Sequence, residues 1–436
     1  MMLWFEKIIF YLLVFCLPLQ ARHIFYSFGQ GFNEWLSLSL FATDLLVLAL
    51  LWLWFCRSGK KLFNQERGSF SWQKPETWLV IFLLISLSSI ALADNKWLGF
   101  YSWLKLVELA GLFLYIKNNV DKVFDLKIFW KTYIAGALLQ SLIAIAQFFK
   151  QQSLGLKYFG ESPLSPSIDG VAKIVVDGAK IIRAYGLTPH PNILAAILII
   201  AIFGLAWLFL QRNSKKDFYL FSISFAIILL ALFFTFSRSV IIAGGAFFVA
   251  WLFSLWRKKE FRQKAIFVFL LLIIGYTSLV AYYWPLYASR FSTDNLINSQ
   301  SANLRVYYNQ VAIDSISSNP LLGVGQGNFV NNFSQDYSSL ESWVFQPVHN
   351  IYLLIASETG FIGLSLFSFF MFLIFRGVLK NKRLAMENCF LYIFCFILLI
   401  GLADHFWWDL QQGQILFWLM LGLLANEKKE DYVEKI

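Results

Sequence analysis

The chain has 436 residues, of which 58% are hydrophobic and only 14% are charged. Soluble domains carry about 25% charged residues, so this composition excludes an ordinary soluble protein and indicates a polytopic membrane protein. The net charge of +10 is also found in nucleic-acid-binding proteins, but here it follows the membrane topology described below. The four cysteines form no CxxC pair and are typical of packing residues.

Apolar runs long enough to cross a bilayer recur along the whole chain, since a spanning helix needs roughly 20 apolar residues. They predict a single all-α membrane domain over residues 1–436 with about twelve transmembrane helices. The first run also resembles a signal peptide, but no small-residue cleavage site follows it, so we interpret it as a helix. The predicted spans are residues 4–20, 36–56, 76–93, 97–117, 127–149, 190–211, 217–236, 239–256, 264–284, 349–376, 386–402 and 410–425.

The basic residues are concentrated in alternate connections between these helices. When the N-terminus is placed in the cytoplasm, the short outer connections contain only Arg22, Lys96 and Arg238 as basic residues. This positive-inside bias predicts that both termini are cytoplasmic, with residues 426–436 as a short tail. The positive charge therefore reflects topology, and no nucleic-acid partner is expected.

Two outer connections, residues 150–189 and 285–348, are long enough to be functional. The second lies between the ninth and tenth helices and is the largest hydrophilic part of the protein. Within it, residues 303–317 have apolar residues at helical spacing, which predicts an amphipathic helix at the outer surface. Residues 319–329, NPLLGVGQGNF, form a glycine-rich turn region. The candidate chemistry therefore lies in the outer loops, on a helical scaffold.

Three arginines on the outer side are candidate binding residues. Arg238 lies between two serines in the abrupt turn that joins the seventh and eighth helices, and an arginine at this depth is costly without a partner or a wet cavity. We interpret Arg238 as a guanidinium held in place for a function. The alternative is an interfacial arginine whose side chain extends to the lipid headgroups. Arg305 lies on the predicted surface helix, and the alternative interpretation is a solvated charge. Arg183 lies just before the sixth helix, and the alternative interpretation is a capping or interfacial charge.

Two further positions carry ionisable groups in or beside a span. Lys105 and Glu108 are three residues apart and share one helix face, where a self-neutralising structural pair is the alternative to a functional one. His349 is predicted in the first turn of the tenth helix, after Pro347, which suits a helix start. The helix dipole disfavours protonation there, so a neutral imidazole can accept a proton. The alternative is a histidine that only hydrogen-bonds at a helix end.

Several catalytic signatures are absent from the sequence: GxxxxGK[ST], HExxH, GxSxG and an Asp-x-Asp pair. GVGQGNF superficially resembles a phosphate-binding loop but lacks the strand and helix around it. Asp404, His405 and Asp409 near the last outer turn are able to hold a metal, but we favour a wet pocket or helix capping for them. No metal site is therefore predicted.

The outer motifs resemble those of a known family. His349–Asn350, nine residues, Gly360, two residues and Gly363 match the signature His-(Asn/Ser/Gln)-x9-Gly-x-x-Gly of bacterial O-antigen ligases at every defined position. NPLLGVGQGNF resembles the family segment Pro-leu-x-Gly-x-Gly-x-x-Phe. Ser-Arg-Ser after the seventh helix, Arg183 with the following HPN, and the twelve-helix plan with its large loop also fit. The motifs define the superfamily well and its individual members poorly.

This resemblance implies a GT-C-like fold and an inverting glycosyltransferase that uses neither metal nor cofactor. The superfamily contains O-antigen ligases, polysaccharide polymerases and protein O-oligosaccharyltransferases. They move a glycan from undecaprenyl diphosphate to an acceptor outside the bacterial inner membrane. Family members often have tryptophan shortly after the loop arginine, whereas Tyr307 and Tyr308 follow here, so Arg290 is an alternative to Arg305. The implied catalytic residues are His349, Arg238 and Arg305. We expect Arg183, Lys105, Arg290 and Asn350 to bind substrate.

Among the possible reactions, the complete histidine motif favours ligation of O-antigen to lipid A–core. The alternatives are a polysaccharide polymerase and a protein O-oligosaccharyltransferase, and the acceptor is not readable from the sequence. A lipid-glycan transporter is the non-enzymatic alternative. Transporters place charges at the midplane and show internal repeats, whereas the notable charges here lie at the outer edge, apart from Lys105 and Glu108. We expect a multi-pass inner-membrane enzyme whose active site faces the periplasm.

Overall fold

A computed structural model describes residues 2–29, 32–65, 71–211, 214–291, 296–336, 344–380 and 389–426. Within these ranges every predicted apolar run contains a helix. The helices are α1 (Met2–Cys16), α2 (Ala42–Gln65), α3 (Pro75–Ser89), α4 (Lys96–Asn119), α5 (Leu126–Lys150), α6 (Pro191–Leu210), α7 (Lys215–Phe234), α8 (Arg238–Trp256), α9 (Lys259–Tyr282), α13 (Ile351–Lys380), α15 (Cys389–Ile400) and α17 (Gln411–Leu424).

Eight helical segments in the described residues are long and apolar enough to cross a membrane: α3 with the short helix after it, α4 to α9, and α13. This confirms a polytopic membrane protein. The helices α1, α15 and α17 have 15, 12 and 14 residues, which is shorter than a bilayer-spanning helix requires. The count of twelve spans therefore stays a prediction.

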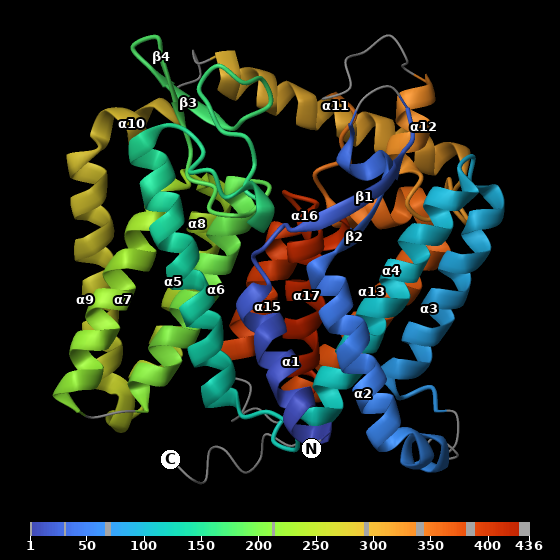
Figure 1. Cartoon of the computed structure of the whole chain (residues 1–436), viewed down its shortest axis with the longest axis horizontal. Helices are drawn as coiled ribbons and strands as arrows, with labels where there is room; N and C mark the ends of the chain where they lie inside the picture. The colour runs from blue at the N-terminus through green and yellow to red at the C-terminus, as the bar shows by residue number, and fades with distance from the viewer. Residues whose placement is uncertain are drawn as a thin grey trace.

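The long helices run side by side, and the short elements gather at one end of the bundle (Figure 1). These elements are α10 (Trp284–Ser289), α11 (Leu296–Ser318), α12 (Phe329–Asp336), α16 (Phe406–Asp409) and the two β-hairpins. We call this end the loop end. The N-terminus lies at the opposite end of the bundle (Figure 1).

Two antiparallel hairpins correct the all-α expectation to a mostly helical fold. Strand β1 (Arg22–Ser27) pairs with β2 (Ser37–Phe41), and β3 (Lys173–Val176) pairs with β4 (Ala179–Ile182). The span predicted from residue 36 in fact begins as β2, whose side chains alternate between buried and half-buried as a strand requires. The carboxylate of Asp44 then accepts from the backbone N–H of Phe41 (2.8 Å), where α2 begins.

The loop predicted over residues 285–348 contains α10, α11 and α12. The helix predicted over residues 303–317 is confirmed as part of α11. Residues 292–295 and 337–343 of this loop, and residues 427–436 of the predicted tail, lie outside the described residues. The division of the chain into membrane domain, outer loop and tail stays a prediction.

The glycine-rich segment before α12 lies against a bend in α13. Gly360 has φ 69°, which interrupts the helix there. The backbone N–H groups of Val324 and Gly325 donate to the carbonyls of Ser357 (2.8 Å) and Glu358 (3.1 Å), and Phe361 N–H donates to Pro320 (2.8 Å). A Cβ on Gly360 would lie 2.0 Å from the Leu321 carbonyl oxygen. The segment is therefore joined to α13 backbone to backbone, which fixes α11 and α12 relative to that helix.

Candidate active site

His349 lies directly before α13, not in its first turn. The helix begins at Ile351, and Asn350 caps it by accepting from the N–H groups of Tyr352 (2.9 Å) and Leu353 (3.2 Å) through Oδ1. A side-chain oxygen of this kind satisfies N–H groups that have no partner within the helix. The structure thus gives Asn350, expected to bind substrate, a capping role.

The imidazole of His349 is held between two rings. It stacks on Tyr308 of α11 with centroids 5.7 Å apart and planes 3° apart, and it meets the ring of His405 edge-on at 4.9 Å. The Tyr308 hydroxyl donates to the carbonyl of Val344 (2.7 Å), which fixes its ring. His349 Nδ1 is buried and has no hydrogen-bond partner among the described residues. Neither Tyr308 nor His405 was predicted to contact His349, because both are distant in sequence.

A buried polar network extends from Asp404, close to His349, to the start of α6. Asp404 Oδ2 accepts from the side-chain amide of Asn192 (2.7 Å), and Asn192 Oδ1 accepts from Arg183 (2.9 Å) and from the Ser237 hydroxyl (2.8 Å). Arg183 Nε also donates to the carbonyl of Thr235 (2.6 Å). Arg183 therefore holds the turn before α8 in place. Asn192 joins these elements. It lies in the HPN segment, for which no separate role was predicted.

Arg238, Arg290 and Arg305 converge on the same region from three elements. The Arg238 guanidinium is exposed, donates to the carbonyl of Arg290 and lies 5.6 Å from the centre of the Phe291 ring. Arg305 Nε is buried without a hydrogen-bond partner among the described residues. Burial, and then the charges of Arg238 and Arg305, lower the pKa of Arg290 to about 10. Mutual repulsion among these arginines marks a site suited to an anion.

Burial and positive neighbours disfavour the charged form of two histidines at this site. Burial and the neighbouring His405 lower the pKa of His349 to about 3. Burial and the charge of Arg183 likewise lower the pKa of His190, next to α6, to about 3. His405 differs, because although burial opposes its charge, Asp409 accepts at 2.8 Å and raises its pKa. The lowered pKa of His349 thus has burial and positive neighbours as its main causes.

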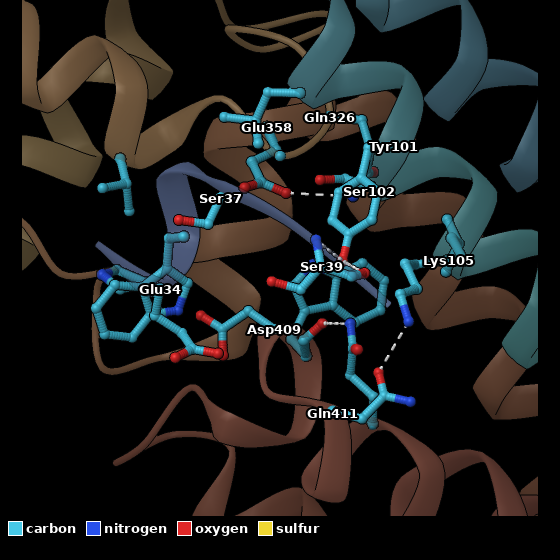
Figure 2. Close-up of a pocket in the computed structure, with 18 of the residues that line it drawn as sticks. Glu34, Ser37, Ser39, Tyr101, Ser102, Lys105, Gln326, Glu358, Asp409 and Gln411 are labelled. Atoms are coloured by element: carbon cyan, nitrogen blue, oxygen red, sulfur yellow. Dashed lines mark hydrogen bonds between the residues drawn. The ribbon is translucent and has the colours of Figure 1, made fainter. Parts of the chain in front are cut away.

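Lys105 lies apart from the arginines, on the wall of a polar cavity (Figure 2). Its ammonium group forms an ion pair with Asp44 of α2 and donates to Gln411 Oε1 (3.1 Å), while Glu108 is 4.0 Å away. Helix spacing predicted a pair of Lys105 and Glu108 alone. In the structure Asp44, which lies on another helix, is the closer partner of Lys105. Asp44 was missed, since helix spacing carries no information on contacts between helices.

Three residues at the site have donor atoms close enough to hold a metal ion. The ligand atoms of His349, Asp404 and His405 all lie within 4.8 Å of one another. This set differs from the one considered from sequence, because Asp409 is hydrogen-bonded to His405 instead. The backbone N–H of His405 donates to Asp404 Oδ1 (2.9 Å), so both carboxylate oxygens of Asp404 already accept hydrogen bonds.

The identity of this region follows from a comparison with protein families. Residues 223–368 match the model of the O-antigen ligase family. The matched O-antigen ligase segment contains Arg238, Arg290, Arg305 and His349, so the resemblance of the motifs is confirmed where the arginines and the histidine lie. Arg183 and the Asp404–Asp409 segment are outside it. A comparison with curated proteins finds no match for the chain. Proteins of the O-antigen ligase family are glycosyltransferase-like ligases and polymerases that act on lipid-linked glycans.

Proposed function

We propose that the protein transfers a glycan from undecaprenyl diphosphate to an acceptor hydroxyl at the loop end, with ligation of O-antigen to lipid A–core as the reaction. The observation that carries the proposal is the convergence of Arg238, Arg290 and Arg305 near the buried imidazole of His349. The proposal includes a GT-C-like fold and a loop end that faces the periplasm. Formation of product from purified protein, undecaprenyl diphosphate glycan and lipid A–core tests it directly.

In the proposed mechanism the arginines bind the diphosphate of the donor. Guanidinium groups bind phosphate oxygens through two hydrogen bonds at once and stay charged at working pH. As the bond from the anomeric carbon to the diphosphate oxygen breaks, negative charge grows on the leaving group, and the arginines stabilise it. The acceptor oxygen forms the new bond from the opposite face, and its proton passes to His349. One displacement of this kind inverts the anomeric carbon.

The identity of the acceptor distinguishes ligase from the alternatives. A polysaccharide polymerase or a protein O-oligosaccharyltransferase would use the same donor geometry with another glycan or a protein as acceptor. Product formation with one of these acceptors and none with lipid A–core would replace the ligase proposal while keeping the donor site. A lipid-glycan transporter would move the donor without breaking the glycosidic bond to diphosphate.

We expect transfer to persist in excess EDTA, because the arginines supply the positive charge that a metal would otherwise provide. Product formation from the purified protein, measured with and without EDTA, checks this. The His349, Asp404 and His405 cluster makes the test informative. Loss of activity that a divalent metal restores would contradict arginine-only stabilisation and assign that cluster to the metal.

Orientation in the membrane can be tested with single cysteines in a variant that lacks the four native ones. We expect Ser301→Cys, exposed on α11, to react with an impermeant thiol reagent added from the periplasm, and Lys122→Cys, exposed at the opposite end, to be protected. The motivation is the concentration of basic residues at the end that contains Lys122. Labelling of Lys122→Cys alone from the periplasm would invert the orientation and exclude a periplasmic site.

A further inference from the structure

A polar cavity of about 100 Å³ lies beside the histidines, between β2, α4, α13 and the α16–α17 turn (Figure 2). Its wall includes Pro347, two residues before His349, and Asp409, which is hydrogen-bonded to His405. The volume admits several water molecules, which a polar group of a ligand can displace. None of the described residues that line it is an arginine, so it is chemically distinct from the diphosphate site.

Three residues that line the cavity each have a buried polar atom with no hydrogen-bond partner among the described residues. These atoms are the indole nitrogen of Trp35, Oε1 of Gln326 and Oδ2 of Asp409. Buried polar atoms are nearly always paired in native proteins, so each indicates a missing ligand or water. The set contains one donor and two acceptors. A hydroxyl group can both donate and accept, and thus suits this wall better than a group that only accepts.

The charge of the cavity disfavours an anionic ligand. Its one cation among the described lining residues is Lys105, which is already paired with Asp44 and Gln411. Carboxyl groups of Glu34, Glu358 and Asp409 line the same space. Glu34 is itself paired with Arg22. A phosphate or carboxylate would therefore meet carboxyl groups and no available cation, whereas the apolar surfaces of Trp35 and Trp408 suit a sugar ring.

We infer that this cavity binds the sugar residue of the acceptor that carries the attacking hydroxyl, and that this residue is neutral or cationic. The inference rests on the proposed function and names the acceptor subsite within it. The diphosphate of the donor then binds at the arginines and the acceptor sugar at the cavity, and the pair His349 and His405 adjoins both. The donor region carries the arginines and the cavity has no available cation, so the two regions favour different groups.

The test fills the cavity without touching the arginines. Leu106 of α4 is buried on the cavity wall, and Leu104 on the same helix is 47% exposed, so Leu106→Phe and Leu104→Phe are matched variants. We expect Leu106→Phe to raise the KM for the acceptor about tenfold and to leave the KM for undecaprenyl diphosphate glycan unchanged. The reason is that the larger side chain weakens acceptor binding equally in the ground state and the transition state. Leu104→Phe should behave like the wild type.

A binding measurement accompanies the kinetics, with the full chain in nanodiscs and saturation-transfer NMR as the readout. Methyl β-glucoside and methyl β-glucosaminide should give signals with the wild type and Leu104→Phe and lose them with Leu106→Phe, while glucose 6-phosphate gives none. Gln326→Met removes the unpartnered amide oxygen at similar size and should weaken the signal, which keeps the test valid if Leu106→Phe does not fold.

Equal signals from all three sugars, or neutral-sugar signals that survive both Leu106→Phe and Gln326→Met, would overturn the assignment and leave the cavity as a hydrated space. Binding of undecaprenyl diphosphate is measured on the same samples. If the wild type binds methyl β-glucoside at the cavity but not undecaprenyl diphosphate, the proposed function fails and the cavity still binds a sugar.

Discussion

Replacing Arg238 by lysine is expected to remove most transfer activity while leaving the protein expressed and folded. Lysine keeps the positive charge but loses the planar fork that binds two phosphate oxygens. The guanidinium is exposed, and its hydrogen bond goes to a backbone carbonyl, so its loss leaves little unsatisfied in the core. Removal of one group that stabilises a developing anion typically costs about 10²–10³-fold in kcat. Initial rates with purified donor measure this loss.

Arg257 provides the control for this change. It lies at the other end of the same helix, and its guanidinium is 5.6 Å from the centre of the Phe253 ring, as that of Arg238 is from Phe291. Arg257→Lys should retain full activity. If Arg238→Lys and Arg238→Ala both turn over like the wild type, binding of the diphosphate by this arginine is rejected.

Replacing His349 by alanine is expected to lower turnover about 10²–10⁴-fold, the range for loss of a general base. Donor binding should persist, because the arginines bind the diphosphate. His349→Gln can still form hydrogen bonds but cannot take a proton at neutral pH, so it should be as impaired as His349→Ala. His23→Gln, on the exposed strand β1, is the control. Near-wild-type turnover of His349→Gln would make His349 a positioning residue.

The pH dependence separates the base from a positioning group. A general base is active when neutral, so activity falls as the pH decreases through the pKa of His349. Burial and His405 lower that pKa to about 3 in the free protein. A bound diphosphate adds negative charge nearby and favours the imidazolium, which raises the pKa. We therefore expect the acid limb of kcat at higher pH than the acid limb of kcat/KM. An acid limb that persists unchanged in His349→Gln would contradict the assignment.

The helices were predictable because hydropathy is a local property of the sequence. Each apolar run contains a helix, and the amphipathic periodicity of residues 303–317 located α11. The hairpins were missed although two local signals were present. Ser37 to Phe41 alternates polar and apolar residues, and Asp177–Gly178 is a favoured hairpin turn whose residues have φ 50° and 81°. Both signals were overlooked because the sequence was interpreted only in terms of helices and loops.

The candidate site was predictable only as separate residues. Motifs identified Arg238, Arg305 and His349, and the structure brings these residues together from α8, α11 and the start of α13. The partners that define their chemistry, Tyr308 and His405, are joined to His349 by tertiary contacts that no spacing in the sequence encodes. The pairing of Lys105 with Asp44 has the same origin. The sequence therefore predicts which basic residues lie at the site, whereas the residues that contact them are known only from the tertiary structure.

Because α13 is interrupted at Gly360, the number of residues between His349 and Gly360 sets the distance and the rotation between these two positions. Asn350 starts α13, and the glycine-rich segment holds the same helix where Gly360 interrupts it. Ten residues of helix span about 15 Å, and one added residue would lengthen this by about 1.5 Å and rotate one end by about 100° relative to the other. Such an insertion would swing His349 away from Tyr308 on α11, whereas a substitution within the same stretch adds no residue and leaves the distance intact. The count of residues between His349 and Gly360 is thus constrained by geometry even where their identity is free.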